Sequence, residues 1–491
     1  MVAIVLVLGV GNILFGETVP AGGGFGWDGV TYAEMVRRLG AMISDGELSR
    51  YYSQRILPSL IVKAMLALTG AEFSNQNIIR GFEILNLLSF VLGVVIWNRM
   101  ADLLSLGQSG RWLGFASLFL NYFATKNLMY YAVLTDGLAL LVSLLMLLLF
   151  LERRPLLLLA VTIAGSFVWQ LTGFYGAVML ISLNLRLPDD ASVRLPSTAA
   201  DWTPRDRHMR AFLMFVAAAA AAVSIVVLLQ LVAARKTGSV THELGIFLTG
   251  APSMIVVVLA LWILIGPILL SRRAPLAMLA DVPLRLYLLA GAALLIPQIA
   301  FTLLSNPNVS NPSGMLYVLQ LVVFPMTGRG KFLMPFLSAT LLWGPAVLLV
   351  MLRWKDVSAE LHKIGLGPVF VVAITLPLVL VTESRFMLGG WPCLVLGLAL
   401  ALERSGISKP LLYLFAALTI LNGQIWLKFN IAPWVGNDYA DLTEFPKQMY
   451  FLHYGPWMGW PAYLVQLPLV LAAAWLLWIA MRQGNTNLGK D

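Results

Sequence analysis

The sequence predicts an all-α polytopic membrane protein, and three observations support this prediction. Of its 491 residues, 59% are hydrophobic and only 12% are charged. A soluble domain has about 25% charged residues, so this chain has too few polar side chains to cover a water-facing surface. Apolar runs that approach the roughly 20 residues of a spanning helix recur along its whole length. This composition excludes a soluble enzyme and a disordered chain, and the single cysteine, Cys393, excludes an intrachain disulfide.

Taken in order, the apolar runs predict about 13 to 14 transmembrane helices in a single integral membrane domain, 1–491. The longer candidates are 78–98, 112–128, 133–151, 211–233, 246–270, 283–304, 332–352, 409–427 and 461–481. The shorter candidates are 1–15, 155–169, 172–185, 367–382 and 387–402. We interpret 56–70, which contains Lys63, as a re-entrant or interfacial helix. The run 1–15 lacks a basic n-region, so a retained helix is expected rather than a signal peptide.

The positive charges predict the orientation in a cell membrane. With the N-terminus and the C-terminus in the cytoplasm, the inner loops are short and repeatedly basic, as in ERRP, SRRAP and RWK. The net charge of +9 therefore does not indicate a nucleic-acid partner. Several cations nevertheless fall on the outer side, which normally avoids them: Arg37, Arg38, Arg50, Arg55, Lys63, Arg80, Arg329, Lys331 and Arg385. Their clustering indicates a use.

Three outer loops are long enough to carry function, namely 16–77, 305–331 and 428–460. In the first of them, the spacing from Val30 onward predicts an amphipathic interfacial helix with its apolar side in the headgroup zone. Asp28 stands just before this helix, either as a helix cap or as a general base. Arg55 opens the next apolar run, either as a snorkelling side chain or as an anion clamp.

The motifs of this loop resemble those of the GT-C superfamily of polytopic glycosyltransferases. They are W-D-G-x-x-Y, with Trp27, Asp28 and Tyr32, and Y-Y-x-x-R-x-L-P, with Tyr52 and Arg55. Two further matches are Leu134-Thr135-Asp136-Gly137 and the stretch Thr382-Glu383-Ser384-Arg385-Phe386. Many members of the superfamily have an acidic pair in the first loop, whereas here Gly29 follows Asp28. This departure weakens any inference of a metal-dependent subtype.

The resemblance implies that a sugar moves from a polyprenyl-phosphate donor to a glycan, lipid or protein acceptor on the extracytoplasmic face, with inversion. Asp28 would be the catalytic base or orienting carboxylate. The donor phosphate would be held by Arg55, Arg329, Lys331 and Arg385. The pocket would be completed by Trp27, Tyr32, Tyr52, Asp136, Gln170, Tyr175 and Glu383. We expect neither a cofactor nor an obligatory metal.

Structural interpretations compete with several of these assignments. Asp136 could be a helix cap, and Glu383 and Arg385 could form a mutual or cross-helix ion pair. Gln170 and Tyr175 could belong to a Gly-rich turn rather than line a site. Other functions also stay open: a transporter or flippase of lipid-linked glycans, a polymerase or ligase of the O-antigen type, or a membrane scaffold.

Overall fold

The structure is a computed structural model, and it describes residues 1–186, 240–269, 271, 275–309, 331–381, 383–431 and 458–487. Arg329, the predicted span 211–233 and most of the loops 305–331 and 428–460 lie outside these residues. The described part of the chain contains helices and no strand, which confirms the all-α class.

The helices up to residue 186 are α1 (Val2–Phe15), η1 (Ala21–Gly24), α2 (Asp28–Ser44), α3 (Arg50–Ser53), α4 (Ile56–Leu68), α5 (Asn75–Leu103), α6 (Gln108–Phe119), η2 (Phe123–Asn127), α7 (Leu128–Tyr130), α8 (Asp136–Leu151), α9 (Pro155–Ser166) and α10 (Thr172–Ile181). Those after residue 239 are α12 (Val240–Leu269), α13 (Pro275–Ala280), α14 (Leu284–Leu304), α16 (Met334–Trp343), α17 (Ala346–Leu352), α18 (Trp354–Ile364), α19 (Leu366–Leu378), η4 (Ser384–Gly389), α20 (Trp391–Ser405), α21 (Lys409–Gly423) and α22 (Trp460–Asn487).

Four stretches of the described helices are long and apolar enough to cross a membrane: Asn75–Leu103, Pro252–Leu269, Leu284–Leu304 and Trp460–Arg482. These stretches support an integral membrane protein. Several predicted spans correspond to shorter apolar helices, among them α1, α8, α9, α10 and α19. The total of about 13 to 14 spans stays a prediction.

Two predicted spans are broken in the structure, each for a local reason. In 332–352, Gly344 adopts a φ of 79° between α16 and α17, and Pro345 follows it. Proline disfavours the helical conformation of the residue before it, so the helix ends there. In 112–128, α6 ends at Phe119, and the Asn121 side chain bonds to backbone groups on both sides, at Ser117 and Ala124. Such bonds compete with the regular helical pattern, and the chain continues as the π-helical turn η2.

The predicted first-loop helix forms as α2, and it starts at Asp28. Its apolar face was expected in the headgroup zone. Instead this face is covered by protein, because α2 packs on α4 and α5 and leaves Tyr32, Met35 and Val36 with no exposed surface. The segment 56–70 is the short helix α4, which itself packs against α5. Hydrophobic burial therefore fixes the first loop onto the bundle.

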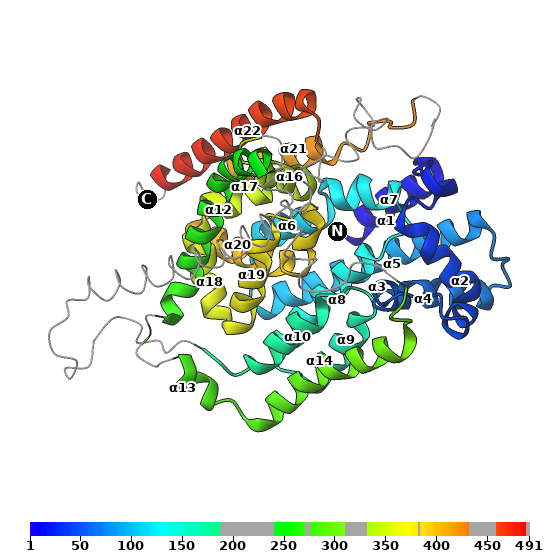
Figure 1. Cartoon of the computed structure of the whole chain (residues 1–491). Coiled ribbons are helices and arrows are strands. Elements are labelled where there is room, and N and C mark those ends of the chain that lie inside the picture. Colours follow the sequence, from blue (N-terminus) through cyan, green and yellow to red (C-terminus); the bar gives the residue numbers. More distant parts are fainter. Residues whose placement is uncertain are drawn as a thin grey trace.

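Figure 1 shows the first-loop helices α2, α3 and α4 together at one end of the molecule, on the right, and α13 and α18 toward the left. We call these the first-loop end and the opposite end. Helices α5 and α8 pack against each other between the two ends, and α20 packs against α6, α8, α18 and α19. The site described next lies where α2, α3, α8 and η4 approach one another at the first-loop end.

Candidate acid–base and anion site at the first-loop end

Asp28 is the first residue of α2, and its carboxylate accepts hydrogen bonds from side chains. The Tyr51 hydroxyl donates to Oδ2 at 3.3 Å and the Tyr52 hydroxyl donates to Oδ1 at 3.5 Å. The N-cap position belongs to Trp27, and no side chain caps the helix there. The carboxylate is therefore occupied by neighbouring phenols rather than by the helix amides that a capping role requires.

Arg55 lies between α3 and α4 and faces the same carboxylate, with a guanidinium nitrogen 3.7 Å from Oδ2 of Asp28. Its side chain is only 2% exposed, whereas that of Asp28 is 28% exposed. A snorkelling arginine keeps its charged group in water, so burial rules out that interpretation of Arg55. One guanidinium nitrogen donates to the Tyr32 hydroxyl at 2.9 Å, and the guanidinium lies 4.2 Å from the centre of the Tyr51 ring.

Trp169, in the α9–α10 link, forms the other wall around Arg55. The guanidinium of Arg55 lies 5.1 Å from the centre of the Trp169 ring, and that ring packs at 5.7 Å against Phe386 of η4. Trp169 is 1% exposed, and neither its indole N–H nor the Nε of Arg55 has a hydrogen-bond partner among the described residues. Leaving a buried donor unsatisfied costs about 1–3 kcal/mol. Two such donors on contacting side chains indicate a place where a ligand can accept hydrogen bonds.

A second charged group lies beside the first. Arg385 of η4 donates to Oδ2 of Asp136 at 3.1 Å and also to the carboxylate of Glu383. Asp136 is the first residue of α8 and is 1% exposed, and no other described residue donates a hydrogen bond to its Oδ1. Arg385 thus forms both of the ion pairs considered above, one with Glu383 close by in the sequence and one with Asp136 of another helix.

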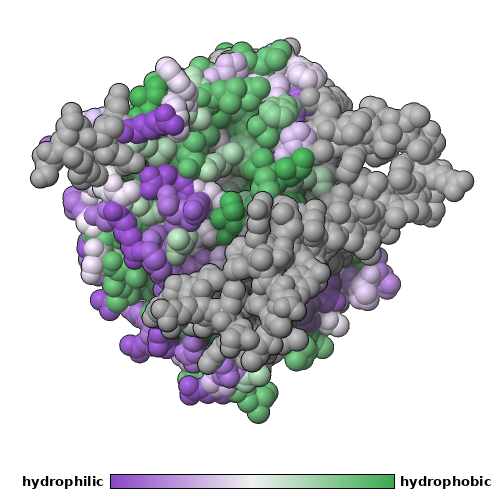
Figure 2. Space-filling model, turned by 90° about the vertical axis from the view of Figure 1, so that its left-hand side faces the viewer, coloured by the Kyte–Doolittle hydropathy of each residue, from purple (hydrophilic) through white to green (hydrophobic). Residues whose placement is uncertain are grey.

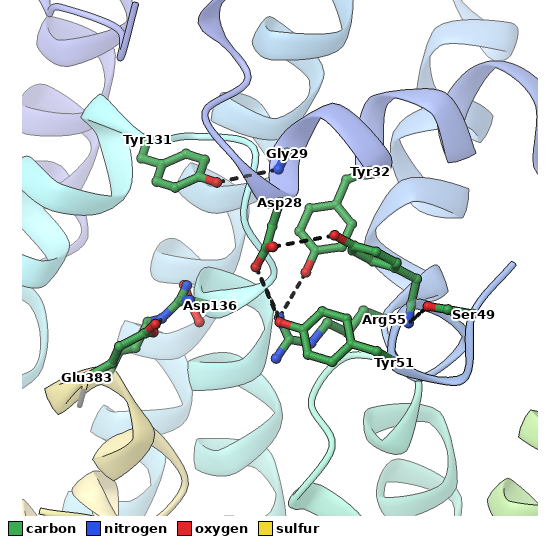
Figure 3. A network of polar contacts seen from close by, with 11 residues as sticks. Asp28, Gly29, Tyr32, Ser49, Tyr51, Arg55, Tyr131, Asp136 and Glu383 are labelled. Carbon is green, nitrogen blue, oxygen red and sulfur yellow. Dashed lines mark hydrogen bonds and ion pairs between the residues drawn. The ribbon is translucent and has the colours of Figure 1, made fainter. Parts of the chain in front are cut away.

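The two groups are close enough to interact electrostatically (Figure 3). Burial raises the pKa of the Glu383 carboxyl, Arg385 opposes this, and the charges of Asp28 and Asp136 raise it further. Three carboxylates face two guanidinium groups here, so the formal charge of the ionised site is −1. A proton on Glu383 would make the site neutral, and its raised pKa favours that proton.

Tyr131 connects the first loop to the start of α8. Its hydroxyl accepts a hydrogen bond from the N–H of Gly29 at 3.4 Å, and its ring meets that of Trp27 edge-to-face at 6.0 Å. Burial raises the pKa of Tyr131 well above its ordinary value, so the phenol stays neutral. Trp27 is thereby placed beside Asp28, as the motif implied.

The other predicted site residues have different neighbours. Tyr175 is buried and accepts a hydrogen bond from Thr375 at 3.4 Å, between α10 and α19. Lys331 is buried and donates to the carbonyl of Met458, with its ammonium 5.3 Å from the centre of the Trp460 ring. Gln170 is partly exposed in the α9–α10 link. The structure therefore brings together Asp28, Arg55, Asp136, Glu383 and Arg385, with Trp27, Tyr32 and Tyr52 around them.

Sequence reasoning missed three members of the site: Tyr51, Tyr131 and Trp169. Tyr51 is part of the Y-Y-x-x-R motif and could have been chosen with Tyr52. Trp169 directly precedes Gln170 at the break between two short apolar runs, and such a break indicates a lined or buried position. Tyr131 has no comparable signal, because its role depends on contact with Gly29.

No group of three or more His, Cys, Asp or Glu side chains that could hold a metal ion occurs among the described residues. In comparisons with known proteins, no family model matches the chain, and no curated protein or solved structure matches it significantly.

Proposed function

We propose that the protein is a membrane glycosyltransferase of the GT-C type. It transfers a hexosyl or pentosyl group from a polyprenyl-phosphate carrier to an acceptor hydroxyl on the extracytoplasmic face, with inversion. The observation that supports this proposal most is the pairing of a partly exposed carboxylate, Asp28, with a fully buried guanidinium, Arg55, 3.7 Å away. A base for the acceptor and a positive charge for the leaving phosphate are the two groups that this reaction needs.

In the proposed reaction the acceptor enters from the aqueous side and its hydroxyl donates its proton to Asp28. The hydroxyl oxygen then forms a bond to the anomeric carbon while the bond from that carbon to the phosphate oxygen breaks. The electron pair of the broken bond leaves on the polyprenyl phosphate. Fixed donors aimed at this developing charge lower the barrier without reorganising during the reaction.

Arg55 and Trp169 are the donors best placed to receive the leaving phosphate, because the Nε of Arg55 and the indole N–H of Trp169 are buried and have no hydrogen-bond partner in the described part of the chain. Arg385 already has two carboxylate partners, Asp136 and Glu383. We therefore assign Arg55 to the phosphate and Arg385 to holding η4 against α8. Arg329 lies outside the described residues, and Lys331 is engaged at the start of α22.

The test is an assay of purified protein with a panel of short-chain polyprenyl-phosphate sugars and mixed acceptors. Asp28→Asn keeps one acceptor oxygen for the phenols but removes the base, so transfer should fall by a factor of about 10²–10⁴. The matched control is Asp45→Asn, an exposed residue at the far end of the same helix, which should leave transfer unchanged.

Three outcomes would count against the proposal. Full turnover in a folded Asp28→Asn variant would remove Asp28 as the base. Movement of the intact carrier across vesicles, with no sugar released, would favour a transporter or flippase. Transfer of whole lipid-linked glycans, in place of single sugars, would favour a polymerase or ligase of the O-antigen type.

A further inference from the structure

A second place of interest lies at the opposite end of the bundle. The C-terminal ends of α5, α8, α10 and α18 surround a hollow there, and its lining includes the apolar side chains of Leu104, Phe150 and Leu183. Helix α8 begins at Asp136 in the candidate site and ends at Leu151 in this hollow. Sixteen residues of helix rise about 24 Å, so the hollow and the candidate site are separated by the length of α8.

Three cations line the same hollow: Arg153, Arg186 and Lys363. Nearby acidic side chains are already paired. Glu152 pairs with Arg99 at 3.1 Å, and Glu360 pairs with Lys363 and with Arg404, both at 2.8 Å. The side chains of Arg153 and Arg186 are exposed, and within the described part of the chain neither forms a hydrogen bond or an ion pair. No carboxylate among the described residues pairs with either charge.

The charge of the helix C-termini explains only part of the clustering of cations at this hollow. Each helix C-terminus carries a partial negative charge that favours a nearby cation. However, the last carbonyls of α8 receive backbone N–H groups, from Glu152, Arg153 and Arg154. The guanidinium donors of Arg153 and Arg186 thus stay available. Guanidinium groups present a planar fork of donors that matches phosphate oxygens.

The walls distinguish between two sources of phosphate. A soluble phosphate would use the cations and gain nothing from the leucines and the phenylalanine. A phospholipid presents a phosphate followed by glycerol and acyl chains, and it would use both the cations and the apolar wall. Figure 2 looks onto the opposite end, where hydrophilic and hydrophobic residues adjoin among the coloured residues. The chain carries apolar helices of spanning length, so phospholipids surround the protein in a membrane.

We propose that this hollow binds the phosphate headgroup of an anionic phospholipid, with Arg153 and Arg186 as the phosphate ligands and the apolar wall against the upper part of the acyl chains. The site is independent of the proposed transferase chemistry. The bound lipid belongs to the leaflet on the other side of the bilayer from the candidate site. It contacts the C-terminal ends of α5, α8, α10 and α18.

The experiment titrates phosphatidylglycerol into the purified full chain in neutral detergent and counts bound lipids by native mass spectrometry. Phosphatidylcholine with the same acyl chains and inorganic phosphate serve as separate arms. The test variant is Arg153→Gln with Arg186→Gln, which keeps a polar side chain at each position and removes both charges. A cation near an anionic lipid contributes roughly fivefold in affinity, so the double variant should bind phosphatidylglycerol roughly 25-fold more weakly.

The matched control is Arg285→Gln with Arg482→Gln, which removes the same charge from exposed positions at the start of α14 and near the end of α22, outside the lining of the hollow. This control variant should bind phosphatidylglycerol as tightly as the parent protein does. Equal weakening in both double variants would show a general charge effect and overturn the proposal. Tight binding that persists in the Arg153 and Arg186 variant would overturn it as well, and so would saturable binding of inorganic phosphate without any preference for the lipid.

Discussion

Asp28 and Arg55 differ in burial, and this difference assigns them different partners. The carboxylate is 28% exposed and the guanidinium is 2% exposed. In the proposed reaction, an acceptor that arrives from water therefore meets Asp28 first, and the phosphate must go deeper to reach Arg55. The phenols of Tyr51 and Tyr52 hold the carboxylate by hydrogen bonds, so its position is set before any ligand binds.

The ion pair between Arg385 and Asp136 yields a prediction about stability. Both side chains are buried, so Arg385→Gln leaves Asp136 and Glu383 without their positive partner. Breaking a buried pair by removing one member costs about 3–5 kcal/mol of unfolding free energy. Asp136→Asn in the same chain should restore part of that loss, because it removes one of the two carboxylates left without a positive partner. Denaturation in mixed micelles measures both effects.

Arg99→Gln is the matched control for this cycle. Arg99 pairs with Glu152 at 3.1 Å, but its side chain is 58% exposed. Exposed pairs contribute at most about 1 kcal/mol, so this variant should unfold almost like the parent. If Arg385→Gln were as mild as Arg99→Gln, the pair with Asp136 would not exist in solution.

At the scale of elements, the entry into α2 depends on a glycine. Gly26 has a φ of 71°, and a Cβ at this position would lie 2.3 Å from the ring of Tyr131. Gly26→Ala must strain the backbone and displace Tyr131 from the N–H of Gly29. We expect a loss of about 1–3 kcal/mol in unfolding free energy together with reduced transfer.

Gly40→Ala, inside α2, provides the contrast to Gly26→Ala. A Cβ at Gly40 would meet nothing within 4 Å, and alanine loses less backbone entropy than glycine in a helix. This variant should gain about 0.5–1 kcal/mol. Thermal unfolding of the two variants side by side gives the comparison, and equal melting temperatures would contradict the placement of Gly26.

Glu17 connects three elements and yields a prediction about pH. It follows α1, pairs with Lys126 of η2 at 3.2 Å, and accepts hydrogen bonds from the N–H groups of Phe429 and Asn430 at 2.8 and 2.9 Å. Burial raises the pKa of Glu17, but these two N–H groups and the Lys126 ammonium outweigh it and hold the pKa below its ordinary value of 4.5.

A carboxylate with a lowered pKa stabilises the folded state above its ordinary pKa, and this contribution is lost as the pH falls through the folded value. Glu17→Gln should therefore lower the unfolding free energy by about 1–3 kcal/mol at pH 7. The difference in unfolding free energy between the variant and the parent should shrink in acid, below pH 4.5. The exposed Glu72→Gln serves as the control and should show no such dependence. A pH-independent gap at Glu17 would mean that its charge is not what holds these elements together.

At the scale of the whole molecule, the orientation in the membrane can be tested with two cysteines. Gln76 is an exposed residue near the start of the spanning helix α5. Gln108 is an exposed residue just after the turn that follows α5. In intact cells, a maleimide that cannot cross membranes should label Gln76→Cys and leave Gln108→Cys unlabelled. The native Cys393 is 1% exposed, so the parent chain is the unlabelled control. The reverse pattern would invert the proposed topology, and labelling of both positions would contradict the span.

Much of the fold could be predicted from composition and local pattern. The low charge and the recurring apolar runs predict helices in a membrane, because a helix satisfies its own backbone hydrogen bonds wherever water is absent. The breaks at Gly344 and Asn121 were not predicted, although Pro345 is a visible signal for the first. The burial of the α2 apolar face could not be predicted, since an amphipathic face looks the same whether lipid or protein covers it.

The sequence by itself determined the all-α membrane class and selected Asp28 and Arg55 as a pair worth testing, since both lie in short motifs of one loop. Only the tertiary structure decided that Arg385 pairs with Asp136, which lies 249 residues away along the chain, and that Trp169 contacts Arg55. The physical reason is that hydropathy and turn residues act over a few neighbouring positions. Which helix ends meet depends on how the whole bundle packs, and the charged groups at those ends can be assigned partners only once that packing is known.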